Sequence, residues 1–298
     1  MTKVLLFGGS GLVGSGFIGL NSQGFEIKAP LAQEVDILNK DQLLKQMEEF
    51  RPDTVINFAA YTNVEEAENE RDDKNGICYK INVTGAKNVT QACRDFNIHL
   101  IHISTEYVFN GEKDVTPYNE EDRPDPINWY GQTKYMAETE VLNYQLALVA
   151  RISMPYTAHY KLKKDIARFF LEQLKDGKQI KAIEDQKITP TLVSDIANAL
   201  KVFIEKKTLG IYHVSAKDSV TPLELAKTIA ETFHLDYSLI SSILFDEYNL
   251  QKKGKLLKNS WLSPAKFDKE FGDDILHTVE EGIALFAQEL GLSKQAVD

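Results

Sequence analysis

Tyr130 and Lys134 are spaced so that, on a helix, both side chains lie on one face about one turn apart. A free phenol has a pKa of about 10. A nearby ammonium that stabilises the phenolate allows the phenol to give its proton to a developing alkoxide near neutral pH. Ser104 and Thr105 add hydroxyl groups shortly upstream, at the end of an apolar run. Because Tyr-x-x-x-Lys pairs also arise by chance on helix surfaces, the chemistry depends on what the rest of the chain places beside them.

A second group of residues, Gly8, Gly11 and Gly14, forms a G-x-x-G-x-x-G pattern around Leu12 and Val13. The pattern follows a short apolar run and opens a helical one. A sharp turn off a strand needs residues without a Cβ atom, and the helix that follows presents free N–H groups and the positive end of its dipole to an anion. We therefore expect a turn that binds the pyrophosphate of a dinucleotide; the alternative is a tight turn with no ligand.

The choice between NAD and NADP depends on the end of the second expected strand. In an NAD site an acidic residue there binds the ribose 2′-hydroxyl, but here Ala29 and Pro30 occupy the position. Lys28 would suit the 2′-phosphate of NADP, although a solvated lysine is an equal interpretation. The choice stays open, with NADPH slightly preferred.

Strands and helices alternate through the first half of the chain, which predicts an α/β fold with a doubly wound parallel sheet of the Rossmann type. Residues 221–224 (Thr-Pro-Leu-Glu) form a capping box with proline at the first helical position. The expected strands cover 4–7, 25–29, 54–58, 100–104, 146–152 and 210–214, and the expected helices cover 41–50, 82–96, 130–144, 166–174 and 221–234.

The alternation weakens beyond residue 152, where basic and polar segments surround the expected helix 166–174. We therefore expect two domains. Residues 1–152 form the NAD(P)-binding domain, which also receives part of 190–215, and residues 153–298 form a smaller C-terminal α/β lobe that binds substrate. Residues 293–298 are expected to be a frayed end.

Charge and composition exclude several classes of protein. The chain has 34 Lys and Arg against 44 Asp and Glu, a net charge of −10, which argues against nucleic acid or an anionic membrane as the main partner. No apolar stretch is long enough to span a bilayer, and no signal peptide is apparent. Cys78 and Cys93 are expected to be reduced thiols in a cytoplasmic protein, and the six histidines have no metal-ligand spacing, so no metal is expected. Glu65, Glu66 and Glu68 are interpreted as a solvated face.

Four segments together resemble the extended short-chain dehydrogenase/reductases, specifically the dTDP-4-dehydrorhamnose reductase branch. They are the glycine turn and residues 57–68, 103–111 and 126–134, which include Ser-Thr-Glu-Tyr-Val-Phe and Tyr-Gly-Gln-Thr-Lys. The resemblance is dense over 1–152 and thinner beyond. It implies hydride transfer from NAD(P)H to C4 of a nucleotide-linked 4-keto-6-deoxy sugar, by a protein that binds that sugar and can form a homodimer.

The resemblance also implies roles for particular residues. Thr105 would polarise the carbonyl group, Tyr130 would be the acid and Lys134 its partner, with Tyr130 and Lys134 also bordering the cofactor. Thr105, Glu106 and Met154 would contact the substrate. The cofactor would lie against Gly8, Gly11, Leu12, Val13 and Gly14 at the pyrophosphate, Asp36 and Ile37 at the adenine, and Ala59, Ala60, Tyr61 and Thr62 at its middle.

Three departures from the branch lie on the substrate side. Glu106 replaces the usual Asp and has a longer reach, Met154 replaces a Trp, and Leu256-Leu257 replaces Arg-Pro. A lost Arg removes a bidentate contact suited to a diphosphate. These departures fit either a different substrate or a lost one.

The alternative is therefore a non-catalytic NADP-binding subunit that resembles the regulatory subunit of methionine adenosyltransferase, whose Arg-Ile after the equivalent strand is similar to Arg151-Ile152. An epimerase or dehydratase relative is a further interpretation. The dehydratase is disfavoured because its Asp-Glu pair after the threonine is replaced here by Glu106-Tyr107.

Overall fold

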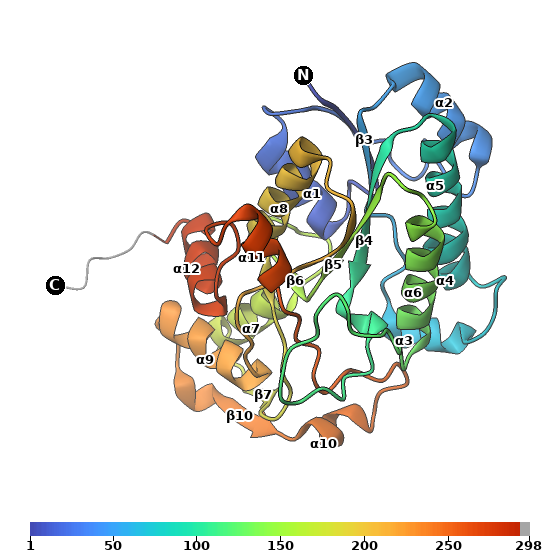
Figure 1. The fold of residues 1–298 in the computed structure, drawn as a ribbon. Helices are drawn as coiled ribbons and strands as arrows, with labels where there is room; N and C mark the ends of the chain where they lie inside the picture. Colours follow the sequence, from blue (N-terminus) through green and yellow to red (C-terminus); the bar gives the residue numbers. More distant parts are fainter. Residues whose placement is uncertain (293–298) are drawn as a thin grey trace.

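The structure is a computed structural model that describes residues 1–292. A six-stranded parallel sheet crosses the larger lobe (Figure 1). The expected frayed end, 293–298, lies outside the described residues. The central strands form because short apolar runs are buried on both faces, as parallel sheets require. In sheet order the strands are β2 (Glu26–Lys28), β1 (Lys3–Phe7), β3 (Thr54–Asn57), β4 (His99–Thr105), β5 (Ala147–Ile152) and β9 (Gly210–Val214).

The strand order creates a crevice at one edge of the sheet. From β1 the chain passes first to β2 on one side and then to β3 on the other, so β1 and β3 are neighbours whose outgoing connections diverge. Ligands of open α/β sheets bind at the carboxyl ends of strands at such a switch point. The glycine turn after β1 lies there. The residues that directly follow β3 and β4 lie at the same carboxyl end of the sheet, because the strands are parallel.

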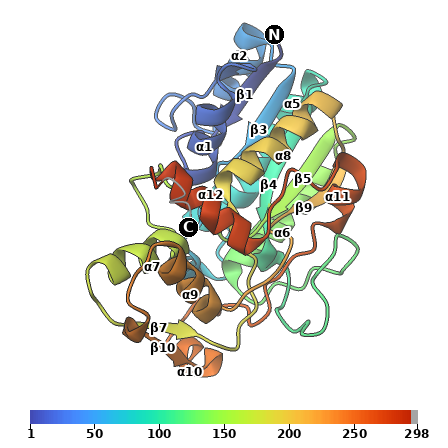
Figure 2. The same ribbon diagram turned by 90° about the vertical axis from the view of Figure 1, so that its left-hand side faces the viewer.

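Helices cover both faces of this sheet, as the predicted doubly wound fold requires (Figure 2). One face carries α1 (Leu12–Asn21), α8 (Val193–Lys206) and α11 (Ala265–Phe271), which bury aromatic and branched side chains such as Phe17 and Phe203. The opposite face carries α2 (Lys40–Phe50), α5 (Ala86–Asp95) and α6 (Trp129–Leu142), packed through Leu43, Val89 and Val141.

The expected helix 82–96 begins differently from its prediction. A π-helical turn at Lys80–Gly85 follows a short helix, α4 (Ile77–Tyr79), and only then does α5 start. Asn82 lies in this turn, and its side chain accepts from the Tyr61 N–H (2.8 Å) and donates to the Tyr61 carbonyl (3.2 Å). The π turn therefore fixes the loop after β3, a use typical of π-bulges near functional sites.

The chain leaves the large sheet after β5, builds part of the smaller lobe, and returns to add α8 and β9. Gly16 makes this return tight, because a Cβ atom there would collide with the Val193 side chain. The helix α8 therefore packs closely across α1. Both returning elements fall within residues 190–215, the stretch for which a share in the larger domain was expected.

The smaller lobe pairs short parallel strands and packs them against helices (Figure 2). The predicted capping box of α9 is confirmed, with Thr221 and Glu224 each bonding the other's backbone. Across the described part of the chain, none of the helices combines the length and apolar character needed to cross a bilayer. The elements of this lobe are β6 (Pro155–Tyr156), α7 (Ile166–Lys175), β7 (Ile180–Ile183), β8 (Thr191–Leu192), α9 (Pro222–Thr232), β10 (Ile240–Ile243), α10 (Phe245–Asn249) and α12 (Val279–Glu289), while α3 (Val64–Ala67) belongs to the larger lobe.

Candidate active site

The glycine turn has the geometry of a phosphate-binding cradle. Gly8 has φ +77°, and a Cβ atom there would lie 2.5 Å from the Ala59 nitrogen. A Cβ atom on Gly14 would lie 2.8 Å from the Gly8 carbonyl oxygen, so the helix starts directly against the turn. Gly11 caps α1 without any side-chain partner, and the first turn holds no acidic residue. The free N–H groups and the dipole of α1 therefore suit an anion.

A cavity of about 420 Å³ begins at this cradle and continues to the far end of β4. It passes the loop after β3, reaches the amino end of α6, and ends against the smaller lobe. A dinucleotide lying along it would meet the cradle at one end and the Tyr130 and Lys134 region at the other. Of the residues expected in the site, those that line the cavity are Gly8, Gly11, Leu12, Val13, Gly14, Ala60, Thr62, Thr105, Glu106, Tyr130, Lys134 and Met154.

Four expected cofactor residues do not line this cavity. Ile37 is buried in the core beside Gly85, and the Asp36 carboxylate accepts from the Leu38 N–H at 2.9 Å. Ala59 donates its N–H to Asn57 at 3.1 Å, and the Tyr61 hydroxyl donates to Glu66 at 2.7 Å. Each of the four has a contact that stabilises the loop in which it lies.

The amino end of α6 is fixed by three contacts that together set the position of Tyr130. Asn128 caps the helix by accepting from the Gly131 N–H at 2.8 Å, and Glu68 accepts from the Trp129 N–H at 2.6 Å. Gly131 lies directly on the 3₁₀ turn after β4, because a Cβ atom there would collide with the Tyr107 carbonyl oxygen. Tyr130 is thus held beside Thr105 by close backbone packing.

The interpretation of Glu65, Glu66 and Glu68 as a solvated face is wrong for Glu68, whose side chain is only 10% exposed, whereas Glu65 stays accessible to water. Glu68 is committed to the Trp129 N–H, and Glu65 accepts from the backbone N–H groups of Lys253 and Gly254. The latter contacts lower the pKa of Glu65. Glu65 on α3 and Glu68 directly after it therefore fasten this segment to its neighbours.

Burial dominates the electrostatics around the phenol. The pKa of Tyr130 lies well above its usual value of about 10 because the side chain is desolvated and faces the Glu106 carboxylate, while a hydrogen bond with Thr105 acts in the opposite direction. Tyr130 therefore keeps its proton at neutral pH. In the protein without bound ligands, burial and Glu106 therefore outweigh the stabilisation of the phenolate that was expected from Lys134.

Glu106 holds the hydroxyl proton of Thr105. The Thr105 Oγ1 donates to Glu106 Oε2 at 2.6 Å, and Glu106 is 4% exposed. Desolvation raises the pKa of Glu106 to about 7, although hydrogen bonds from Thr105 and from the Met154 backbone favour the ionised form. The Thr105 hydroxyl is therefore bound to a group that titrates near neutrality.

Met154 stands at the cavity in an unusual backbone conformation. Its φ is +39°, in the left-handed region that residues with a Cβ atom rarely adopt. The strain is sustained by two neighbours, since the Met154 N–H bonds Glu106 and the Met154 carbonyl accepts from the Thr191 N–H at 3.3 Å. The end of β5 is thus tied to both the Thr105 turn and the smaller lobe.

The smaller lobe contributes cavity residues to which sequence reasoning gave no role: Tyr160, Lys163, Lys164 and Asp165. Asp165 caps α7 and forms an ion pair with Arg168 at 2.7 Å. The basic character of 161–164 was visible in the sequence, and the Asp165 to Arg168 spacing is the signal that marks the helix start. Only the folded chain shows that this start borders the cavity.

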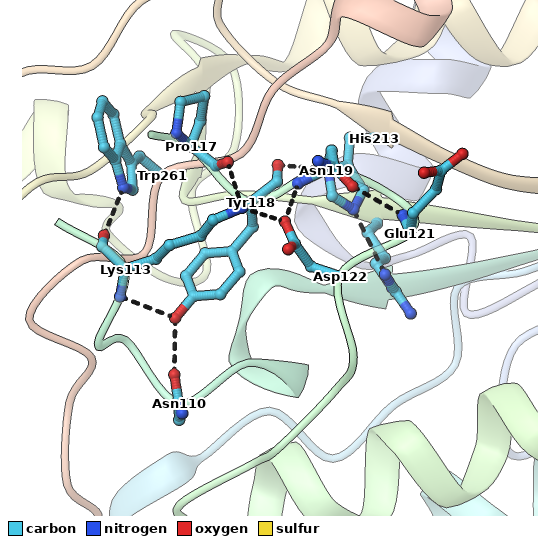
Figure 3. Close-up of polar contacts among 10 residues, drawn as sticks. Asn110, Lys113, Pro117, Tyr118, Asn119, Glu121, Asp122, His213 and Trp261 are labelled. Atoms are coloured by element: carbon cyan, nitrogen blue, oxygen red, sulfur yellow. Dashed lines mark hydrogen bonds and ion pairs between the residues drawn. The ribbon is translucent and has the colours of Figure 1, made fainter. Parts of the chain in front are cut away.

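A polar loop, residues 110–122, packs against β9 and the segment around Trp261. Figure 3 shows Tyr118 at its centre, with its hydroxyl donating to Asn110 (2.7 Å) and accepting from the Lys113 N–H (3.2 Å). The Trp261 indole donates to the Lys113 carbonyl at 2.9 Å, and the Tyr118 carbonyl lies 3.1 Å from a ring nitrogen of His213. These contacts hold the segment between the Thr105 turn and α6 in a defined place.

Replacing Gly8 by Ala is expected to weaken dinucleotide binding and stability, because the positive φ and the backbone of Ala59 leave no room for a methyl group. The strain is on the order of 1–3 kcal/mol. Gly19, on the helix α1 that follows the turn, is the control, since a Cβ atom there meets nothing within 4 Å. Fluorescence titration with NADPH and urea unfolding measure both variants, and equal behaviour would contradict this use of Gly8.

The glycine turn at the switch point, with a Tyr and a Lys one helical turn apart at the other end of one cavity, defines the short-chain dehydrogenase/reductase class. The family model described as the RmlD substrate binding domain matches residues 1–291, and the chain belongs to this family.

Two curated relatives and one solved structure illustrate the family. The spore coat polysaccharide biosynthesis protein SpsK of Bacillus subtilis is 31% identical over 83% of this chain and 85% of its own. The methionine adenosyltransferase 2 subunit beta of Rattus norvegicus is 29% identical over 81% of this chain and 75% of its own. The dTDP-4-dehydrorhamnose reductase of Bacillus anthracis, solved in complex with NADP, is 29% identical and covers 97% of this chain and 100% of its own, with a TM-score of 0.88.

These likenesses bear on the expectations from sequence. The family and the Rossmann-type sheet are confirmed, and so is the class, an oxidoreductase that uses NAD(P). The reaction and the residues that perform it are proposals.

Proposed function

We propose that this chain reduces the keto group of a nucleotide-linked 4-keto-6-deoxy sugar, with NADPH or NADH as the reductant. The observation that carries the proposal is the single cavity that runs from the glycine cradle past Thr105 and Tyr130 to the smaller lobe. It has a phosphate-binding end, a proton donor and a far end lined from another lobe. The named reductases among the relatives support the same reaction.

The division of labour that we propose follows the two lobes. Residues 1–152, together with α8 and β9, hold the dinucleotide, and the rest of 153–298 binds the nucleotide sugar. Lys163 and Lys164 at the cavity support this assignment, because ammonium groups attract a diphosphate without imposing the fork geometry of an arginine.

In the proposed reaction Tyr130 is the general acid. The raised pKa of the phenol keeps its proton in place until a more basic alkoxide forms on the substrate oxygen, which then accepts it. A bound reduced nicotinamide supplies the hydride. The Thr105 hydroxyl orients the carbonyl group, and the backbone packing of Gly131 keeps the phenol aligned with it.

Glu106 controls whether Thr105 can donate to the substrate. Thr105 has one hydroxyl proton, and an ionised Glu106 accepts it. A protonated Glu106 carries its own proton and does not require the hydrogen bond from Thr105. The Thr105 hydroxyl is then free to donate to the carbonyl oxygen of the substrate. Since burial raises the pKa of Glu106 to about 7, the productive form is present below pH 7 and is lost as the pH rises through 7.

Glu106→Gln is therefore expected to remove this step from the pH profile of kcat/KM, because an amide does not ionise. The wild-type value should fall about two- to tenfold across neutrality, the equivalent of one hydrogen bond of roughly 0.5–1.5 kcal/mol. Glu112→Gln, an exposed carboxylate in the loop that follows, is the control and should keep the step. If the fall of kcat/KM near pH 7 persists in Glu106→Gln, Glu106 is excluded as its source.

A panel of nucleotide-linked 4-keto sugars tests the reaction itself, with loss of NADPH or NADH absorbance as the readout. We expect consumption with at least one member of the panel. Consumption with none, together with a co-purifying protein, would favour the regulatory-subunit alternative. The Arg151-Ile152 pair does not add support to that alternative, because Arg151 is buried and bonded to Glu138, and so offers no contact to a partner.

A further inference from the structure

His102 lies at the centre of β4, 1% exposed, between a residue of the neighbouring strand and the lysine of α6. Its Nδ1 is 3.3 Å from Asn57 Nδ2, and its Nε2 is 3.4 Å from Lys134 Nζ. Asn57 is its direct partner in the register of β3 and β4. The three side chains form a buried polar row that ends at the cavity.

The orientation of the Asn57 amide follows from its other contact. Asn57 Oδ1 accepts from the Ala59 N–H at 3.1 Å, so the NH₂ group of the amide is the end that faces His102. An NH₂ group can only donate, and Nδ1 of His102 must then be the acceptor. The single ring proton of the neutral imidazole therefore resides on Nε2.

This tautomer directs an N–H group at Lys134. Two N–H groups cannot bond each other, so the contact is favourable only when Lys134 Nζ offers a lone pair as a neutral amine. Lys134 Nζ meanwhile donates to the Ile103 carbonyl at 2.7 Å, which a neutral amine can also do. A hydrogen bond that favours the neutral form of a lysine lowers its pKa.

We propose that His102 is a positioning residue that stabilises the neutral amine of Lys134 and so sets the pH at which the Lys134 ammonium is lost. The proposal deepens the proposed function, since it rests on the role given there to the site around Tyr130. His102 touches neither substrate nor cofactor and acts through Lys134 alone.

The other ionisable groups around Lys134 favour its ammonium form. Glu138 on α6 and Cys78 on α4 both raise the pKa of Lys134, and the Glu138 carboxylate is already paired with Arg151. Desolvation outweighs them and lowers the pKa of Lys134 to about 8. Burial likewise lowers the pKa of His102 far enough that the ring stays neutral beside the lysine.

The sign of the pH effect follows directly. A lysine whose pKa is lowered carries its ammonium below that pKa and loses it above. Dinucleotide affinity and turnover are expected to fall as the pH rises through about 8, where a lysine at its ordinary pKa of about 10.4 would keep its charge.

Nitrogen NMR of the full chain with ¹⁵N-histidine tests the tautomer independently of any activity. We expect the His102 Nε2 signal in the protonated range and Nδ1 in the unprotonated range, with no titration between pH 6 and 9. Loss of the two signals in His102→Gln assigns them. A protonated Nδ1 would overturn the proposal, because Nε2 would then stabilise the ammonium.

Substitutions test the effect on Lys134 through the pH dependence of NADPH binding, followed by fluorescence. His102→Leu removes the hydrogen-bond donor to Lys134. It should shift the alkaline limb of the NADPH-binding profile, the pH range in which affinity falls, to higher pH by about one unit. His102→Gln should keep the limb, since its amide can accept from Asn57 and donate to Lys134. His99→Leu is the control and should leave the limb in place, because His99 is a buried histidine on the same strand whose partners are Thr54 and the Thr208 carbonyl.

An unmoved limb in His102→Leu, or an equal shift in His99→Leu, would overturn the proposal. If His102→Leu does not fold, the NMR result decides alone. Absence of turnover with every nucleotide sugar would instead contradict the proposed function, and would leave both the tautomer and the binding profile to report on His102.

Discussion

Tyr130→Phe is expected to lower turnover about 10²- to 10⁴-fold, the usual contribution of a positioned general acid. The substitution removes one hydroxyl group and keeps the ring, which packs edge-on against Tyr107 with centroids 5.6 Å apart. The fold and the glycine cradle should be unaffected. Stopped-flow or steady-state loss of NADPH absorbance measures the rate, and a fluorescence titration checks that NADPH still binds.

Tyr107→Phe is the matched control for that result. Tyr107 is partly buried against the same cluster and also borders the cavity, yet its hydroxyl is not the group held beside Thr105. We expect its turnover to stay within a few-fold of wild type. Near-normal turnover in Tyr130→Phe, or an equal loss in both variants, would show that the proton comes from elsewhere.

Glu138→Gln is expected to lower the free energy of unfolding by about 3–5 kcal/mol, the typical cost of leaving one charge of a buried ion pair unpaired. Arg151 and Glu138 form a two-pronged contact (2.9 and 2.7 Å) between β5 and α6, with both side chains almost fully buried. The guanidinium also lies over the Phe109 ring, 5.1 Å from its centroid. Because Arg151 is buried, water cannot solvate its charge when the carboxylate is lost. Urea unfolding followed by far-ultraviolet circular dichroism gives the value.

Glu140→Gln, half a turn further along α6, separates this effect from a general loss of helix stability. Glu140 pairs with Lys87 at the surface, where such pairs contribute about 0–1 kcal/mol. The prediction therefore requires a loss at Glu138 several times larger than the loss at Glu140. Similar losses at the two positions would mean that the buried pair adds little to stability.

Local patterns account for what the sequence predicted well. Short, mostly apolar runs such as 100–104 favour strands buried on both faces, and the spacing of Gly8, Gly11 and Gly14 is tied to the turn that leaves β1. The capping box at Thr221 likewise depends only on four consecutive residues, 221–224. Each of these features depends on neighbours in the chain, so each could be found without a tertiary structure.

Features that depend on distant segments could not be found in this way. The raised pKa of Glu106 follows from its burial, and the tautomer of His102 follows from the orientation of Asn57. Lys163 is basic in any reading of the sequence, but only the packing of the smaller lobe brings it to the cavity. Residue identity gives the chemistry that is available, whereas burial and partners decide which form of it is present.

The return of the chain to β9 has a consequence for how the protein is made. During synthesis β5 emerges long before its outer neighbour, because β6, α7, β7, β8 and α8 lie between them in the sequence. Until β9 pairs with it, β5 presents an open edge that invites pairing with another nascent chain. A fragment that stops at residue 152 would keep that edge permanently and would also leave Phe17 without the cover of α8. The dinucleotide half is therefore expected to aggregate when expressed alone, however complete its own motifs are.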